Sequence, residues 1–305
     1  IIAAVGANFP QAAPGASTPE ERGPKAYHQD IFKLRNGQWS KAGTLPAPLG
    51  YAAFASVGKG LAVAGGNYIF HCDSDDFVEA DMLEELYVRA QKIDADIVWC
   101  DWFLTFETNE RSMKQPSYAT SIEALKAMLG GAMKYNVWNK LVKRSLYVEN
   151  DIAFPAGHGM GEDMTMMLLF AHARKVAYLP KAFYHYVKLN TYAFSQTYSD
   201  KHLEELQYNV RNIELKLELL FGTALEQEIS FLKLEAKFPF LLSCDTHKQK
   251  LWREWYPEAN KYILKNRNIS TRSRIIQWCA WKRLNGIIFL YRWFLNRIIY
   301  GIIYK

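Results

Sequence analysis

The stretch IFHCDSDDF, residues 69–77, runs a short apolar strand directly into three carboxylates. Like charges this close repel one another, so they need either a cation or open water around them. The strand ends at Cys72, and we expect it to be a parallel strand whose carboxyl end lies at the edge where open α/β sheets bind ligands. The stretch therefore predicts an α/β sheet with a ligand site at Asp73, Asp75 and Asp76.

Two interpretations of these acids stay open. An EF-hand loop is excluded, because Phe77 and Val78 stand where such a loop needs an oxygen ligand and a glycine. One interpretation is a solvated acidic turn that caps the following helix. The other is a D-x-D site, in which Asp73 and Asp75 hold Mg²⁺ or Mn²⁺ against a diphosphate. Such ions use few protein carboxylates and complete their shell with phosphate and water.

Composition bounds the class of protein. The chain has 305 residues, of which half are hydrophobic and 22% are charged, and this indicates a folded protein with about two domains. The net charge of +6 is unevenly placed, because residues 261–305 carry ten Lys or Arg and no acid. The mildly acidic remainder predicts no nucleic-acid partner. Four widely spaced cysteines and the lack of a visible secretory signal predict a cytoplasmic protein.

Residues 1–66 are rich in Gly, Pro and Ala and predict a small antiparallel β segment, with turns at residues 36–37 and 58–60. The pieces VGANFP, YHQDIFKL and LPAPLGYA resemble one blade of a kelch propeller, in particular that of sialic acid epimerases, also called cyclically permuted mutarotases. This resemblance implies an epimerase or mutarotase fragment as an alternative function. A propeller needs several blades, and no second copy of the pattern follows.

From residue 67 the sequence changes to alternating strands and helices. Apolar runs predict strands at residues 68–72, 96–106 and 175–180, and periodic segments predict helices at 77–93, 121–129 and 163–173. Thr120 and Glu123 form a capping-box pattern before the second helix. From about residue 198 the pattern is helical to the end. The predicted domains are residues 1–66, 67–197 and 198–305.

Three segments carry a second resemblance. They are YIFHCDSDDFVEADMLEELY (68–87), VWNKLVKRSLYVENDIAFPAGHGMGEDMTMMLLF (137–170) and AFYHYVKLNTYAFSQT (182–197). They resemble the D-x-D region and the acceptor half of family 2 glycosyltransferases with the GT-A fold, in that family's order and approximate spacing. The resemblance implies an α/β fold: a partial GT-A (Rossmann-like) sheet with flanking helices and a helical C-terminal tail, preceded by the kelch-like blade.

The same resemblance implies a function, which is metal-dependent, inverting transfer of a sugar from a nucleotide-sugar donor to a glycan or lipid-linked acceptor in surface polysaccharide synthesis. Asp73 and Asp75 would hold the Mg²⁺ or Mn²⁺ ion. Asp163, with Glu162 beside it, would be the carboxylate base that takes the proton of the acceptor hydroxyl. The expected substrate-binding residues are Asp76, Trp138, Asn139, Lys140 and His185.

Several alternatives to these roles stay open. Trp138 is alternatively a core residue, His185 a structural histidine and Glu162 an acid of a helix N-terminus. The family's first strands and nucleotide-binding acidic motifs should precede residue 68, where the chain holds only the blade-like segment. A non-catalytic fusion product is therefore a further alternative. If the site is catalytic, we expect Asp73, Asp75 and Asp163 to converge on one cleft.

The final segment, STRSRIIQWCAWKRLNGIIFLYRWFLNRIIYGIIYK, interleaves Trp, Tyr, Phe and Ile with Arg and Lys. Its apolar runs are shorter than the roughly 18 residues that a membrane-spanning helix needs. The pattern is typical of an interfacial helix with snorkelling basic side chains. Ser270–Lys305 is therefore predicted to bind an anionic membrane surface peripherally, at the inner face of the membrane. The alternative is a helix packed on the enzyme body.

Overall fold

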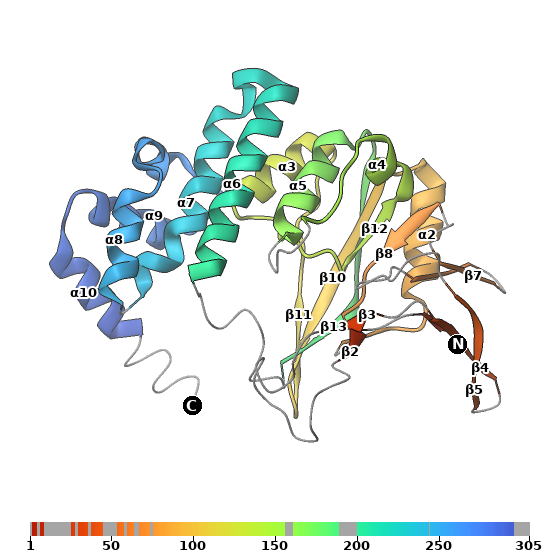
Figure 1. Ribbon diagram of the computed structural model, residues 1–305. Coiled ribbons are helices and arrows are strands. Elements are labelled where there is room, and N and C mark those ends of the chain that lie inside the picture. The colour runs from red at the N-terminus through yellow and green to blue at the C-terminus, as the bar shows by residue number, and fades with distance from the viewer. Residues whose placement is uncertain are drawn as a thin grey trace. The chain divides into compact units, whose positions relative to one another are not determined.

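The computed structural model describes residues 67–73, 76–155, 161–188, 200–243 and 245–295, together with the backbone of seven short strands within residues 1–66 (Figure 1). Asp75, a predicted metal ligand, lies outside the described residues. The chain divides into two compact units. The first comprises Ile1–Lys114, Val137–Val148 and Leu179–Asn190, and the second comprises Gln115–Asn136, Glu149–Tyr178 and Thr191–Lys305.

The described strands of residues 1–66 pair in antiparallel fashion, as predicted. They are β1 (Ile2–Ala4), β4 (Asp30–Arg35) and β5 (Gln38–Thr44) in one sheet, β2 (Ala7–Asn8) with β3 (Ala26–Tyr27), and β6 (Phe54–Val57) with β7 (Gly60–Val63). Arg35 pairs with Gln38 and Val57 with Gly60, so both predicted turns join paired strands. A propeller blade is one four-stranded sheet. The described strands form separate small sheets instead, and a kelch blade is not confirmed.

A six-stranded sheet forms the centre of the first unit (Figure 1). Its strands, in order, are β8 (Tyr68–Phe70), β12 (Lys140–Lys143), β10 (Ile97–Thr105), β13 (Val176–Val187) and β9 (Phe77–Val78), with β11 (Glu110–Met113) paired to β10. Phe70 lies opposite Leu141 in an antiparallel pair. The expectation of a parallel strand before the acids was wrong, because an apolar run predicts burial and does not specify the direction of its neighbour. Among the described strands, β8 has only β12 as a hydrogen-bonded neighbour.

The helix after the acids, α2 (Met82–Ile93), begins later than predicted. Phe77 and Val78 form β9 instead, because Val78 pairs with Tyr184 and Phe77 stacks on His185. Cross-strand contacts of this kind override the local helical pattern. The helix ends at Asp94, which adopts the left-handed conformation with φ 54°. Its buried side chains recur every fourth residue and give it one apolar face: Met82, Leu86 and Ala90.

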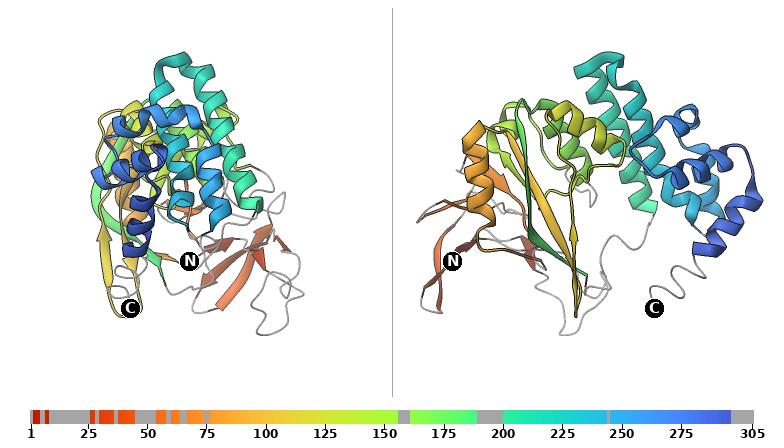
Figure 2. Two further views of the ribbon diagram at one scale, coloured as in Figure 1. Left: turned by 90° about the vertical axis from the view of Figure 1, so that its left-hand side faces the viewer. Right: turned by 180° about the vertical axis from the view of Figure 1, so that it is seen from behind.

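The second unit is mainly helical, which confirms the prediction for the C-terminal part (Figure 2). Its main elements are α3 (Ser121–Leu129), α5 (Glu162–His172), α6 (Asp200–Phe221), η2 (Gly222–Leu225), α7 (Glu226–Leu242), α8 (Thr246–Glu254), η3 (Pro257–Lys265), α9 (Thr271–Trp281) and α10 (Asn285–Phe294), while α4 (Arg144–Glu149) follows β12 in the chain. The predicted capping box is present, with the Thr120 side chain accepting from the Glu123 N–H. Among the described residues, no helix is long and apolar enough to cross a membrane.

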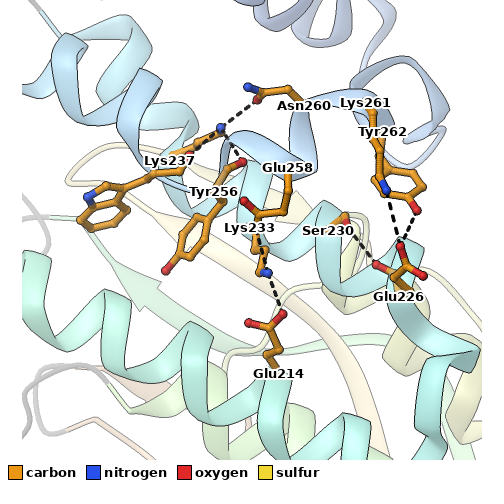
Figure 3. A network of polar contacts seen from close by, with 11 residues as sticks. Glu214, Glu226, Ser230, Lys233, Lys237, Tyr256, Glu258, Asn260, Lys261 and Tyr262 are labelled. Atoms are coloured by element: carbon orange, nitrogen blue, oxygen red, sulfur yellow. Dashed lines mark hydrogen bonds and ion pairs between the residues drawn. The ribbon is translucent and has the colours of Figure 1, made fainter.

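Two lysines of α7 join the helices of the second unit (Figure 3). Lys233 donates to Glu214 of α6 at 2.6 Å and to Glu258 of η3 at 2.9 Å. Lys237 is fully buried and donates to two backbone carbonyls just before η3 and to the amide oxygen of Asn260. Burial lowers the pKa of Lys237 to about 8. These contacts fix η3 against α7 and thereby build the surface on which the final two helices pack.

Glu235, also on α7, is a partly buried residue whose carboxylate Oε1 is buried, and its pKa shifts in the direction opposite to that of Lys237. Burial raises its pKa to about 7, against the smaller lowering effect of Lys134. It packs beside Gly131, whose φ of +87° favours glycine and whose added Cβ would lie 2.9 Å from Glu235 Oε2. The tight contact explains why this carboxyl group is held away from water.

We expect Glu235→Gln to remove a pH dependence of stability. The native carboxyl group keeps its proton up to about pH 7, whereas the unfolded chain releases it near 4.5. Stability should therefore be full below about pH 4.5 and fall as the pH rises to about 7, by on the order of 3 kcal/mol. Gln has no charge to bury, so the variant should be more stable than wild type at about pH 8 and equally stable at about pH 5.

Urea unfolding followed by circular dichroism at these two pH values measures the difference. Glu228→Gln is the matched control, because Glu228 lies on the same helix in a 3.4 Å ion pair with Lys126. Its substitution should change stability by less than about 1 kcal/mol at both pH values. A Glu235→Gln protein with the pH dependence of wild type would contradict the expectation.

Candidate active site

The loop of the predicted D-x-D site is fastened to β13 by one tyrosine. The Tyr184 hydroxyl donates to Asp76 Oδ2 at 2.7 Å and accepts from the Asp73 N–H at 3.0 Å. The Val187 N–H donates to Asp76 Oδ1 at 2.8 Å. Both carboxylate oxygens of Asp76 are thus engaged by β13. The structure therefore shows Asp76 as an anchor of the loop, and its contact with substrate stays a prediction.

Asp73 offers the oxygen chemistry that Mg²⁺ and Mn²⁺ prefer. It lies exposed after β8, at the start of the loop. Among the described residues there is no group of three or more His, Cys, Asp or Glu side chains that could hold a metal ion. The donor chemistry fits an ion that takes two carboxylates and completes its shell with phosphate and water. Asp73 and Asp75 are the residues that would hold it.

Tyr184 is fully buried, and it rests on an aromatic cluster. Its ring stacks on that of Trp138 at 4.4 Å, and Trp138 also meets Trp102 edge-on at 5.1 Å. Burial raises the pKa of Tyr184 far above its usual range, and the Asp76 and Asp73 carboxylates add to the effect. The hydroxyl therefore keeps its proton and remains the hydrogen-bond donor to Asp76.

The W-N-K residues lie in the core beside this loop. Asn139 and Lys140 are fully buried and Trp138 is 4% exposed. Asn139 Nδ2 donates to the Cys100 carbonyl at 2.8 Å, and Lys140 Nζ donates to Asn139 Oδ1 at 2.8 Å. The first bond ties the start of β12 to β10, and the second orients the Asn139 amide. The geometry accords with the alternative that Trp138 is a core residue, and substrate contacts for all three stay predictions.

His185 faces away from the Asp76 carboxylate, because successive strand residues point to opposite sides of a sheet. Its ring is stacked by Phe77 at 4.2 Å and by Phe103 at 4.7 Å. Its Nε2 lies 3.0 Å from Glu79 Oε1, and its Nδ1 lies 3.3 Å from Glu110 Oε2. The structure does not bring the His185 side chain together with that of Asp76, and its proposed role at the site is untested.

The predicted base lies in the second unit, in the first turn of α5. Asp163 Oδ1 accepts from the Met164 N–H at 2.7 Å and from Asn209 Nδ2 at 2.9 Å. Burial raises the pKa of Asp163, although both hydrogen bonds act in the opposite direction. A raised pKa suits a group that must accept a proton near neutral pH. Glu162, half-buried beside it, occupies the helix N-terminus, where negative charge is favoured.

Gly161 allows α5 to begin where it does. A Cβ on this residue would overlap the ring of Pro155, so the close approach of these two residues requires glycine. Asp163 and Asp73 belong to different units, and their convergence on one cleft stays a prediction.

Sequence reasoning missed two residues of this arrangement. The sequence pointed to His185 and not to Tyr184. In a strand, Tyr184 and Tyr186 lie on one face and His185 on the other, and this alternation was the signal for Tyr184. Asn209 follows Asp163 by 46 residues and has no local sequence signal. Both act through contacts between distant parts of the chain.

Comparison with known proteins supports the glycosyltransferase resemblance. Residues 48–165 match the family model of glycosyl transferase family 2. The match begins before the first recognised motif, so β6 and β7 fall within it. The chain is 33% identical over 184 residues to a cholesterol galactosyltransferase of Borreliella burgdorferi. This alignment covers 55% of this chain and 50% of that protein. It is 29% identical over 154 residues to EpsH of Bacillus subtilis, a putative glycosyltransferase, covering 48% and 44% respectively.

The fold is also similar to a solved structure. TarS 1–349 of S. aureus, crystallised in complex with UDP-GlcNAc, superposes with a TM-score of 0.51 at 18% identity, covering 77% of this chain and 68% of that one. This likeness confirms the mixed α/β fold with flanking helices. The chain spans about half the length of the curated relatives it matches. The matches give no support to the epimerase or mutarotase alternative.

Proposed function

We propose that this chain is a metal-dependent, inverting glycosyltransferase that moves a sugar from a nucleotide-sugar donor to a glycan or lipid-linked acceptor. The observation that carries the proposal is the loop of Asp73 and Asp76, which lies within the residues that match glycosyl transferase family 2 and is fastened to β13. The relatives' names supply the reaction class. The likeness to TarS, solved with UDP-GlcNAc, supplies a probe for the donor.

The residues divide the chemistry between them. Asp73 and Asp75 would hold Mg²⁺ or Mn²⁺, which when bound neutralises the negative charge of the departing diphosphate. Asp163 takes the proton of the acceptor hydroxyl. The acceptor oxygen bonds to the anomeric carbon as the bond from that carbon to the diphosphate oxygen breaks. A single displacement of this kind inverts the anomeric configuration.

The hydrogen bonds of Asp163 indicate which of its two carboxylate oxygens is available for proton transfer. Oδ1 already accepts from two N–H donors, so we assign proton transfer to Oδ2. Asn209 fixes the plane of the carboxylate, and burial keeps its proton affinity above that of an exposed aspartate.

Incubation with UDP-galactose and UDP-GlcNAc tests this function. In the presence of Mn²⁺ and lipid extract, we expect UDP release together with a glycosylated lipid or glycan, detected by mass spectrometry. Chelation with EDTA should stop both. A chain that binds no nucleotide and releases none would favour the non-catalytic alternative.

The proposed partner of the C-terminal helices is the anionic inner face of the membrane. Helix α9 packs on the second unit through Ile276, Cys279 and Ala280, beside Phe240 and Trp255. Within the described part of the segment, α9 is thus packed on neighbouring helices, while α10 has an exposed apolar side.

Two sides of α10 have different surroundings. Ile288 is buried in the same cluster as α9, and Arg292 donates to the Ser243 carbonyl at 3.0 Å. Other large side chains of the helix are exposed by 40 to 64%: Ile287, Phe289, Leu290, Trp293 and Phe294.

Two exposed basic residues directly precede α10 in the chain. The turn before α10 holds Lys282, whose Nζ lies 4.1 Å from the ring centroid of the partly exposed Trp281, and Arg283. Apolar side chains enter the interface while Lys and Arg contact lipid phosphates. A lipid-linked acceptor at this surface would be delivered to the enzyme in the plane of the membrane.

A further inference from the structure

One hydroxyl group closes the loop that carries the predicted metal ligands. The Asp76 N–H donates to the Asp73 carbonyl at 3.3 Å, the Asp73 N–H donates to the Tyr184 hydroxyl, and that hydroxyl donates to Asp76 Oδ2. These three hydrogen bonds join Asp73, Asp76 and Tyr184 in a ring. The bond to the carboxylate is charge-assisted and is therefore among the stronger kinds. The backbone position of Asp73 thus depends directly on where the Tyr184 hydroxyl lies.

The Tyr184 side chain is itself closely packed. Its side chain is fully buried, and its ring lies nearly parallel to that of Trp138, with an angle of 19° between the planes. Trp138 precedes the buried Asn139, whose Nδ2 donates to the Cys100 carbonyl of β10, and the buried Lys140, whose Nζ donates to Asn139 Oδ1. The support of the loop therefore runs from β10 through Trp138 to the Tyr184 hydroxyl.

Neighbouring contacts fix the register of β13 on its other side. Tyr184 lies opposite Val78 in the pair of β13 with β9, and the next residue, His185, contacts Glu79. The Val187 N–H supplies the second bond to Asp76. All these contacts lie within the first unit, so the arrangement does not depend on how the two units are placed.

We propose that Tyr184 is the positioning residue of the metal and nucleotide site, and that the W-N-K residues act on that site through it. In this role Tyr184 acts on the site through Asp73 and Asp76. Its hydroxyl holds the backbone of Asp73 and the side chain of Asp76, so that the predicted metal ligand Asp73 is presented in one arrangement before the ion arrives. This inference rests on the proposed function, since it names what prepares that site.

The test is the affinity of the full chain for Mn²⁺ and UDP, measured by electron paramagnetic resonance of Mn²⁺ with and without UDP. Tyr184→Phe removes only the hydroxyl and keeps the stacked ring. We expect it to weaken Mn²⁺·UDP binding by about 10- to 100-fold, the usual effect of removing a group that orients metal ligands. Its Mn²⁺ spectrum should also broaden, because the ligands are no longer held in one geometry.

Tyr262→Phe is the matched control. The Tyr262 hydroxyl also donates to a carboxylate, Glu226 Oε1 at 2.8 Å, but in the second unit (Figure 3). Its Mn²⁺·UDP affinity should equal that of wild type. A merely structural role of Tyr184 would lower the melting temperature and leave the affinity of the folded protein unchanged, and that result would overturn the inference.

A second variant decides the matter if Tyr184→Phe does not fold. Asp76→Asn weakens the same contact from a half-buried loop residue. If Asp76 acts through Tyr184, Asp76→Asn should also weaken Mn²⁺·UDP binding about tenfold or more. If Tyr184→Phe does fold, the double variant should lose little further affinity. An Asp76→Asn protein with wild-type affinity would overturn the inference. A wild-type chain that binds no Mn²⁺·UDP would instead overturn the proposed function, and this inference with it.

Discussion

Asp163→Asn should lower the rate of sugar transfer by about 10²- to 10⁴-fold, the usual contribution of a positioned general base. The amide keeps the shape of the side chain and can still accept from Asn209 and the Met164 N–H through its oxygen. It cannot accept a proton from the acceptor hydroxyl. The melting temperature should therefore change little while the turnover number falls, and the donor KM should stay within about twofold of wild type.

The pH profile of the wild type provides an independent check. The base must be unprotonated to act, so activity should fall as the pH falls through the pKa of Asp163. Burial raises this pKa, which places the acid limb above the ordinary range of an aspartate. The limb should be missing from the residual activity of Asp163→Asn.

Asp245→Asn is the matched control for this variant. Asp245 also stands at a helix N-terminus, where its carboxylate accepts from the His247 N–H at 2.8 Å, but it is exposed. Its turnover should equal that of wild type. An Asp163→Asn protein as active as the Asp245→Asn protein would show that another group is the base.

The second large effect is expected at α10. Replacing Phe289, Leu290 and Trp293 together by Ser should reduce binding to vesicles of phosphatidylglycerol and phosphatidylcholine by more than about 100-fold. Each of these side chains is more than half exposed, so its apolar surface is available for burial in the interface, worth about 1.5–3 kcal/mol per residue. Vesicle cosedimentation at low salt measures the loss.

Added salt and a matched surface variant separate the electrostatic and apolar contributions to vesicle binding. Binding of the wild type should weaken with added salt without vanishing, because salt screens Lys and Arg but not the apolar contacts. Leu219→Ser on α6 removes an apolar side chain that is 87% exposed outside the C-terminal helices, and it should bind like wild type. A wild-type chain that does not bind anionic vesicles at low salt would contradict the membrane role. It would indicate that α9 and α10 serve only in packing within the protein.

Much of the fold could be predicted from local sequence. The strand at β10 and the helices α3 and α5 lie within about one residue of the predicted bounds. Their signals are strong because a buried apolar run, a capping box and a helical apolar pattern each depend on neighbours in the chain. The predicted helical character of the C-terminal region is confirmed for its described residues, from 200 to 294, for the same reason.

What could not be predicted depends on distant contacts. The antiparallel direction of β8 is set by β12, some seventy residues later. The strand β9 replaced the start of a predicted helix because β13 pairs with it. At the site, the acids themselves were visible in the sequence. The groups that hold them, Tyr184 and Asn209, were not, since a hydrogen bond between distant residues leaves no periodic pattern.

The most direct test of the account is a calorimetric titration of the chain with UDP, in Mn²⁺ and again in EDTA. We predict saturable UDP binding in Mn²⁺ that disappears in EDTA. It should also disappear in Asp73→Asn, which removes one of the two carboxylates proposed to hold the ion. UDP binding that is absent in Mn²⁺, or that is equally strong in EDTA and in Asp73→Asn, would contradict a metal-dependent transferase built on this loop.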